Sequence, residues 1–512
     1  MKKTNLLMLT SVLLGITLSS CSKPSDPWKD VVLEKGLNFV TKTFDREKDE
    51  TIDIKISEYG PGNSVGIFAR DSEPGSKKGA IKRKAIKEGI DLYSFNIEDF
   101  KSAGEYNVFL FDKNEDIVKD YDVIKILDTD KNNYQAKDGT FTSKKEGDKL
   151  TSSLTINTEK DATLTYSLYW SKDGVRLSDY TAIEVFTSNQ KEITINFQKN
   201  MFLPSEANQI EVAVKEGRSE SIYVSIDNTL KLEESTLKNT MQVFSDIHIE
   251  SKYTCSNYNS HFVSNLNYIK NNYPTTNGIV CVGDSANSGN ENNYKLFYEY
   301  IDSVFETRPT VYPVLGNHEV QYYDDYNEAI AQYTKSTGMP GAYFTFEIAG
   351  FKCFALGSED TSTHGYMSNE QFAWLEEEMN KCSKTDKIMV FMHQGVYDTV
   401  SGTLPGHGWH GFRTQTEKLR TLFNKFSNAF VFSGHTHQSI DCEQTCNFGY
   451  GDAANYVNTG SSAYILDDNR DETYGSNGYF VEVYEDYLLL KGRNAIENKW
   501  IAAAQFVVPF NK

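Results

Sequence analysis

The chain has 512 residues, more than the roughly 300 that one hydrophobic core usually serves, so two or three domains are expected. Its 71 acidic residues outnumber its 52 basic residues, and the formal net charge of −19 argues against a nucleic-acid polymer as a partner. With 31 tyrosines and 30 phenylalanines, the chain is too aromatic to be disordered.

The first 21 residues have the pattern of an export signal. A basic start precedes the apolar run Leu6–Leu18, which is too short for a stable transmembrane helix. The run ends in Leu18-Ser19-Ser20-Cys21, which resembles the lipobox of bacterial lipoprotein precursors. This resemblance implies that Cys21 is lipidated; the alternative is an ordinary signal peptide. In both cases we expect export to the cell envelope. If Cys21 is lipidated, we expect the lipid to anchor the chain to a bacterial membrane at its periplasmic or outer surface.

The remaining cysteines do not form paired Cys-x-x-Cys units, so a structural zinc site is not expected. Cys281 and Cys353 lie in apolar runs and are predicted to be buried thiols. Cys442 and Cys446 are close together in a polar segment and could form a local disulfide.

Two all-β modules are expected at 30–128 and 129–236, after a polar tether at 22–29. In both, short apolar runs alternate at period two and turn residues separate them, which is typical of antiparallel sandwiches of immunoglobulin or fibronectin size. The modules are interpreted as spacers that lift a catalytic domain off the membrane. The alternative is glycan binding, for which Trp170 and Tyr180 are candidate aromatic contacts. The predicted strands are Thr51–Ile56, Ser64–Phe68, Leu92–Phe95, Tyr106–Phe111, Val123–Ile126, Leu150–Ile156, Leu164–Trp170, Ile193–Phe197, Ile210–Val214 and Ile222–Ile226.

The pattern changes at residue 237, and 237–512 is predicted to be one α/β (α+β) domain. Short apolar strands alternate with amphipathic stretches, and strands return near the C-terminus, where they should complete a second sheet packed on the first. The predicted helices are Asn257–Asn271, Tyr294–Phe305, Asn369–Cys382 and Thr416–Phe426, and the late strands fall in Tyr456–Tyr464, Gly478–Lys491 and Trp500–Val508.

Five apolar runs in this domain end in aspartate, asparagine or histidine. Five of the nine histidines of the chain lie at these ends, where open α/β sheets place their chemistry. Period two should direct Asp246 and His248 to the same side as an oxygen and a nitrogen ligand for one cation, and Asp284 has two oxygens that can bridge two cations. The segments are Ser245-Asp246-Ile247-His248, Gly283-Asp284, Gly316-Asn317-His318-Glu319, His393 and Gly434-His435-Thr436-His437.

As an ordered set over roughly 239–462, these segments resemble the calcineurin-like metallophosphoesterase superfamily. The resemblance implies a four-layer sandwich with a dinuclear metal centre, here preceded by two immunoglobulin- or fibronectin-like modules. The implied ligands are Asp246, His248 and His437 for one metal, Asn317, His393 and His435 for the other, and Asp284 as the bridge. Mixed nitrogen and oxygen ligation suits two divalent or trivalent ions of zinc, manganese or iron.

In the implied mechanism, a hydroxide shared by the metals attacks phosphorus, and His318 protonates or stabilises the leaving oxygen. Many relatives orient this histidine with a carboxylate where this chain has Asn287; an amide can hold the tautomer but stabilises an imidazolium less. Ser288, in place of an arginine, argues against a phosphoprotein phosphatase. Asn287, in place of a tyrosine, together with His248, argues against the iron-tyrosinate centre of purple acid phosphatases.

Two long segments, 321–342 and 395–415, are expected to shape the pocket, with Arg413 binding a phosphate oxygen and Tyr397 stacking on the substrate. The sequence therefore predicts an exported hydrolase of a phosphomonoester or phosphodiester, either a small molecule or a surface phosphate ester. One alternative is a nucleotide or cyclic-nucleotide phosphodiesterase. Another is a surface glycan-binding protein with an inactive phosphoesterase domain.

Overall fold

The structure is a computed structural model, and no helix among the residues it describes is long and apolar enough to cross a membrane. Cys21 and the rest of the predicted export signal lie outside these residues. The described residues are 28–29, 31–46, 49–70, 80–100, 104–112, 118–127, 136–147, 149–158, 163–214, 221–226, 235–250, 256–407, 411–412, 415–473 and 475–511.

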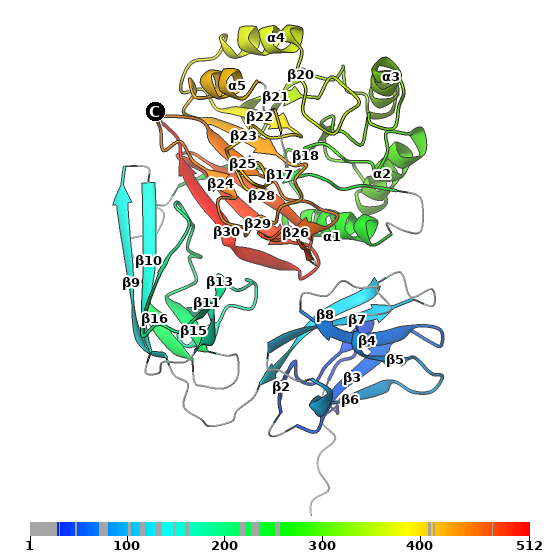
Figure 1. Cartoon of the computed structure of the whole chain (residues 1–512). Helices are drawn as coiled ribbons and strands as arrows, with labels where there is room; N and C mark the ends of the chain where they lie inside the picture. The colour runs from blue at the N-terminus through cyan, green and yellow to red at the C-terminus, as the bar shows by residue number, and fades with distance from the viewer. Residues whose placement is uncertain are drawn as a thin grey trace, which may run out of the picture.

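The first part of the chain folds into two sheets that share one core, drawn in blue in Figure 1. Strand β3 shows why: Ile52, Ile54 and Ile56 alternate with polar residues, so every second side chain enters the core. One sheet has the order β1 (Gly36–Asn38), β3 (Thr51–Ser57), β6 (Leu92–Asn96), and a short 3-10 helix, η1 (Ile97–Asp99), follows β6. The other has the order β2 (Thr43–Asp45), β8 (Val118–Leu127), β7 (Gly104–Phe111), β4 (Ser64–Ala69), β5 (Ala80–Ala85).

The second module also consists of two sheets around one core. Trp170 is 0% exposed and Tyr180 is 8% exposed, so the expectation that these two aromatics are available for a glycan is wrong; both pack into the module interior. One sheet has the order β14 (Glu192–Asn196), β10 (Lys149–Thr158), β9 (Ala136–Glu146). The other has the order β12 (Val175–Arg176), β11 (Leu164–Lys172), β15 (Gln209–Val214), β16 (Ile222–Ser225), with β13 (Glu184–Ser188) also paired to β11.

The remainder of the chain contains two six-stranded sheets whose facing sides form a common apolar core. The first has the order β19 (Val311–Pro313), β18 (Ile279–Cys281), β17 (Leu237–Phe244), β28 (Asn477–Tyr484), β29 (Tyr487–Asn494), β30 (Lys499–Pro509). The second has the order β20 (Phe344–Ile348), β21 (Phe351–Leu356), β22 (Ile388–Met392), β23 (Ala429–Ser433), β25 (Asn455–Asn458), β24 (Cys446–Asn447). A small hairpin of β26 (Ile465–Leu466) and β27 (Glu472–Thr473) completes the described strands.

The sequence suggested that the late strands complete the second sheet, but not all of them join it. Only β25 does so, while β28, β29 and β30 extend the first sheet because β28 pairs antiparallel with β17. Three neighbouring strands run parallel in the first sheet and four in the second, and the strands that end at the predicted site are among them.

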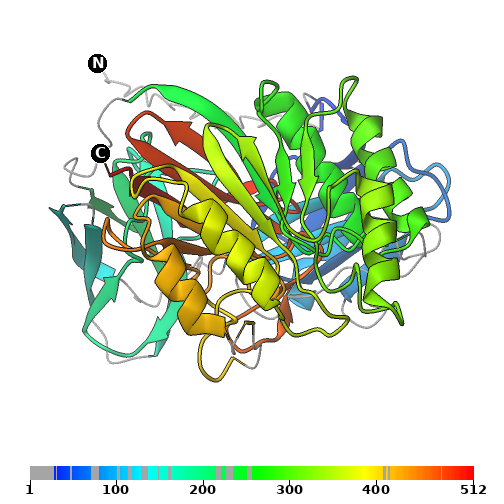
Figure 2. The ribbon, with the colours of Figure 1, turned by 90° about the horizontal axis from the view of Figure 1, so that it is seen from above.

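Helices cover the outer sides of the two sheets. Apolar residues of α1 (Ser256–Asn272) and α2 (Glu291–Val304) pack on the first sheet, and those of α4 (Asn369–Met379) and α5 (Thr416–Phe423) pack on the second. Figure 2 shows the second pair in yellow and orange on a different side of the domain from the green helices. These four helices confirm the sequence prediction.

A fifth helix, α3 (Tyr326–Thr337), was not predicted and lies within the segment 321–342, which was expected to shape the pocket. Its sequence carries both end signals. The side chain of Asp325 accepts a hydrogen bond from the backbone N–H of Asn327, and Gly338 ends the helix with a left-handed φ of 76°.

The cysteine predictions have mixed outcomes. Cys281 and Cys353 are buried free thiols, as predicted. The suggested disulfide is wrong, because Cys442 and Cys446 are both free. Their sulfurs have separate neighbours: the carbonyl of Leu466 for Cys442, at 3.8 Å, and the hydroxyl of Tyr479 for Cys446, at 3.9 Å.

Candidate metal centre

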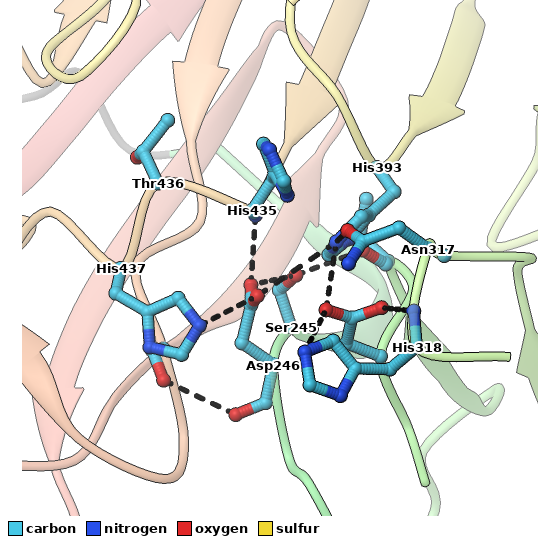
Figure 3. A network of polar contacts seen from close by, with 12 residues as sticks. Ser245, Asp246, Asn317, His318, His393, His435, Thr436 and His437 are labelled. Carbon is cyan, nitrogen blue, oxygen red and sulfur yellow. Dashed lines mark hydrogen bonds and ion pairs between the residues drawn. The ribbon is translucent and has the colours of Figure 1, made fainter. Parts of the chain in front are cut away.

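Five strands deliver the predicted donor residues to one place. Strands β17, β18 and β19 are parallel neighbours in the first sheet, and β22 and β23 are parallel neighbours in the second. Their carboxyl ends therefore lie at the same edge of each sheet, and the loops that follow carry the seven donors. Figure 3 shows the side chains of Asp246, Asn317, His393 and His437 converging from these loops.

The backbone at the donors is left-handed rather than extended. Strand β17 ends at Phe244, so the expectation that Asp246 and His248 share a side through strand periodicity is wrong. A tight turn brings both side chains inward instead. Such φ values cost free energy for residues other than glycine and concentrate at functional sites. Five of the seven donors have them: Asp246 (50°), His248 (52°), Asp284 (50°), His435 (68°) and His437 (54°).

The first donor group contains Asp246, His248 and His437, all buried. His437 Nε2 lies 3.1 Å from Asp246 Oδ1 and 3.1 Å from His248 Nε2. His437 Nδ1 lies 3.2 Å from the Tyr464 carbonyl, to which it donates, so Nε2 is the nitrogen with the free lone pair.

The second donor group contains Asp284, His393 and His435, also buried. His393 Nε2 lies 3.1 Å from both Asp284 Oδ2 and Asn317 Oδ1. Asp284 also falls within a group with His248 and His318, and its Oδ2 lies 4.0 Å from His248 Nε2. This carboxylate therefore stands between the two groups, in the position expected of a bridge.

These contacts fit a cation better than they fit a hydrogen-bond network. His393 Nδ1 donates to the Val282 carbonyl at 2.8 Å, which leaves a lone pair on Nε2 facing two oxygens. Asp246 Oδ1 is buried without a hydrogen-bond partner among the described residues. The His248 nitrogen that faces the other donors is Nε2, which lies 3.1 Å from His437 Nε2. Lone pairs that converge on one point in this way are the arrangement of a metal site, with the carbonyls fixing the histidine tautomers.

The protonation states also suit metal ligation. Burial raises the pKa of the Asp284 carboxyl, but the neighbouring histidine charges, led by that of His393, outweigh it and hold this pKa well below its usual range. Burial lowers the pKa of His248 and of His435 to about 3. Burial also lowers the pKa of His393, but the charges of Asp284 and Asp246 raise it to about 10, so a cation would replace that proton.

His318 lies at the rim of the cluster, with its side chain 22% exposed. Its backbone N–H donates to Asp284 Oδ1 at 2.8 Å, and its Nε2 lies 3.9 Å from Asp284 Oδ2. The sequence predicted that the side-chain amide of Asn287 orients the His318 ring, and this prediction is wrong. His318 Nδ1 contacts the backbone carbonyl of Asn287 at 2.9 Å, because the Asn287 side chain turns away and donates to Glu250 at 3.0 Å.

Glu319 is a residue to which the sequence assigned no role. It is buried, and its carboxylate accepts backbone N–H groups of Gly316 (2.8 Å), Asp284 (3.0 Å) and Ala286 (3.2 Å). It therefore ties the loop that follows β18 to the loop that follows β19. Burial, together with the Asp284 charge, raises the pKa of Glu319 to about 8. The only signal in the sequence was its place directly after the Asn317-His318 pair.

The two residues predicted to contact the substrate are Arg413 and Tyr397. Arg413 lies outside the described residues. Tyr397 is half-buried on the loop that follows His393, and its backbone carbonyl accepts a hydrogen bond from Arg420 of α5 at 2.7 Å. Tyr397 belongs to neither donor group.

The fold and the donors together define a two-sheet α/β domain with a candidate metal centre at its strand ends. Residues 242–439 match the family profile described as calcineurin-like phosphoesterase, and the domain that contains them belongs to the calcineurin-like metallophosphoesterase superfamily. The probable glycerophosphodiester phosphodiesterase GpdQ of Arcobacter nitrofigilis is 23% identical over 210 residues, which cover 38% of this chain and 70% of that protein. The purple acid phosphatase PPD1 from yellow lupin (Lupinus luteus) seeds matches with a TM-score of 0.40 and 12% identity, over 90% of this chain and 92% of that chain.

Proposed function

We propose that this protein is an exported, metal-dependent phosphoesterase that acts on a phosphodiester in preference to a phosphomonoester. The observation that carries the proposal is the pair of donor groups on either side of Asp284, with lone pairs facing one another in a buried site. The seven donors are Asp246, His248, Asp284, Asn317, His393, His435 and His437. Two ions of zinc, manganese or iron fit this set of ligand atoms.

A diester is favoured by the charge around the donors. Among the described residues, every ion pair recorded for Asp246 and Asp284 is with a histidine, and none is with a lysine or arginine. A phosphodiester carries one negative charge and a monoester up to two, so a site without cationic side chains at its acids suits the diester. The similarity to GpdQ, named as a probable glycerophosphodiester phosphodiesterase, points the same way.

When bound, the two ions would polarise the phosphoryl oxygens and increase the acidity of a water molecule. In the reaction, a water molecule releases one proton to the solvent and its oxygen bonds to phosphorus, while the bond from phosphorus to the leaving oxygen breaks. The leaving oxygen takes a proton from His318. The Asn287 carbonyl holds Nδ1 of His318, which leaves Nε2 on the side of Asp284 for that transfer.

The experiment that tests this function is hydrolysis of an aryl phosphate and its bis-aryl diester by metal-stripped protein, with zinc, manganese and iron restored separately. We expect turnover only with metal, and faster turnover of the diester. Asn317→Ala and His435→Ala should abolish both activity and metal content. His318→Ala should lower kcat by about 10²–10⁴-fold with metal retained, as for loss of a general acid. Turnover by metal-free protein would contradict the proposal.

Export and anchoring are proposed from residues 1–21, with Cys21 as the lipidated residue. Metabolic labelling with a fatty acid, lost in Cys21→Ala, is the test. For the domain, we propose the four-layer arrangement of the superfamily, supported by the helices that pack on both sheets. For the two N-terminal modules, we propose an immunoglobulin-like identity, supported by their paired sheets.

A further inference from the structure

One large aromatic side chain next to the candidate catalytic histidine remains open to solvent. Tyr322 is 61% exposed, and its ring centroid lies 5.7 Å from that of His318, edge to face at 75°. It is among the most exposed large hydrophobic side chains of the described residues. An aromatic ring left in water beside a reactive group is a feature that binding of an apolar ligand would explain.

The backbone that carries Tyr322 is fixed. The N–H groups of Val320 and Gln321 both donate to the Asn317 carbonyl, at 3.0 and 2.7 Å. On the other side, the Tyr323 hydroxyl donates to the Gly289 carbonyl at 2.8 Å. Tyr322 therefore stands on a hydrogen-bonded turn that begins at a metal-ligand position, and its place beside His318 is set by the same loop.

Tyr464, which also lies close to the donors, has a different environment. The Tyr464 ring packs against His437, with centroids 4.1 Å apart, and also lies near the rings of Tyr258, at 5.6 Å, and His248, at 6.3 Å. Tyr464 is only partly exposed, so this ring supports a donor histidine. Tyr322 contacts the histidine that would protonate the leaving oxygen and keeps most of its surface free.

We propose that Tyr322 binds the leaving group of the substrate and gives the enzyme a preference for phosphate esters of flat, apolar alcohols over those of small polyols. This inference rests on the proposed function. The leaving oxygen must reach His318, so the carbon group attached to that oxygen lies beside the ring that contacts His318. Packing of the two flat groups stabilises the departing alcohol without adding charge at the site.

The test uses two methyl diesters whose leaving alcohols have nearly equal acidity, methyl 4-chlorophenyl phosphate and methyl hexafluoroisopropyl phosphate. One leaving group is flat and aromatic, and the other is compact. Tyr322→Ala should lower kcat/KM about tenfold for the aryl ester and less than about twofold for the other. Tyr322→Phe should retain the preference because it keeps the ring. Tyr223→Ala, an exposed tyrosine on β16 of the second module, is the matched control and should change neither rate.

A second readout separates binding from turnover. Calorimetric titration of the metal-loaded protein with a non-hydrolysable arylphosphonate should give a Kd that Tyr322→Ala weakens about tenfold, with metal content unchanged. An equal loss on both esters, no loss on either, or a Phe variant as impaired as the Ala variant would overturn the role of the ring while leaving the phosphoesterase proposal intact. If the wild-type protein hydrolyses neither ester with any metal, the proposed function fails and this inference fails with it.

Discussion

Glu319 shows how one buried carboxylate can hold two loops of the candidate metal centre together. Its two oxygens accept three backbone N–H groups, those of Gly316, Asp284 and Ala286. In Glu319→Gln, the amide nitrogen would face the N–H of Ala286, so one bond is lost and two donors oppose each other in a buried place.

We expect Glu319→Gln to lower the free energy of unfolding by about 1–3 kcal/mol and to weaken metal affinity by about 10–100-fold. Chemical denaturation and titration with a metal indicator measure the two effects. The control is Glu328→Gln, an exposed glutamate in the first turn of α3. A variant with unchanged metal affinity would show that the two loops keep their positions without this carboxylate.

His261, on α1, makes the stability of the protein depend on acidity. Burial lowers its pKa from 6.5 to about 4, and its Nδ1 lies 2.9 Å from the Ala463 carbonyl. Between these two pH values the unfolded chain binds a proton that the folded chain does not. The contribution of His261 is therefore complete above pH 6.5 and is lost as pH falls toward 4, by up to about 3 kcal/mol.

The measurement is the free energy of unfolding by denaturant at several pH values from 4 to 7. His261→Gln should flatten this curve relative to the wild type, whereas the exposed His364→Gln should leave the slope as it is. An equally steep curve for His261→Gln would mean that other groups cause the acid sensitivity.

At the scale of the elements, the strands that carry the donors could be predicted because they are short, apolar and buried on both faces. Each is followed at once by polar residues, as at Met392-His393, and this pattern shows in the sequence. The helices α1, α2, α4 and α5 could be predicted because their sequences are amphipathic. Helix α3 was not predicted, although Asp325 and Gly338 mark its ends, because the whole segment 321–342 was assigned to the pocket.

Other features depend on contacts between distant parts of the chain. The left-handed turns at the donors, such as that at Asp246, could not be predicted from residue type, because residues other than glycine adopt this conformation in only a few per cent of cases. The pairing of β28 with β17 joins strands more than two hundred residues apart. The choice of the Asn287 carbonyl over its side chain depends on Glu250, which comes from the loop after another strand.

Gly434 marks a place where two of these loops approach too closely for a side chain. A Cβ atom there would lie 1.8 Å from Ser245 Oγ and 2.5 Å from Asp246 Oδ2. Gly434→Ala must therefore displace the strand end that carries Asp246 or the turn that carries His435. We expect a loss of about 1–3 kcal/mol in unfolding free energy, as for overpacking, together with weaker metal binding.

Elemental analysis after dialysis and thermal denaturation would measure both effects. Gly341→Ala is the matched control, because a Cβ atom at that glycine has no neighbour within 4 Å. If Gly434→Ala bound metal as the wild type does, the two loops would have more room than the distances indicate.

At the scale of the whole molecule, the second module is not a free-standing spacer. Strand β30 pairs with it at two bridges, Tyr180 to Trp500 and Met201 to Phe506, and Ala502 lies in the module core. Figure 1 shows the module beside the red C-terminal strands. The first module is tied to the same region, since Arg70 forms ion pairs with Glu105 of its own module and with Glu497 of the catalytic domain.

Asn200 joins the module to the catalytic domain through hydrogen bonds to Val507 of β30. Its backbone carbonyl accepts the Val507 N–H at 3.0 Å, and its side chain donates to the Val507 carbonyl at 3.0 Å. The side-chain oxygen also accepts the N–H of Leu150, at 2.9 Å. Its φ of 60° is a conformation that asparagine tolerates better than most residues.

Asn200→Ala should therefore lose two side-chain hydrogen bonds, one buried and one partly buried, and strain the backbone, at a cost of about 2–4 kcal/mol. If the module and the catalytic domain unfold together, calorimetry of the wild type gives one transition for both, and the variant gives that transition at lower temperature or splits it in two. Asn208→Ala, an exposed asparagine whose side chain binds Asp173 within the module, is the control. A variant that melts like the wild type would mean that the apolar contacts of Ala502 and its neighbours hold the two parts together without this residue.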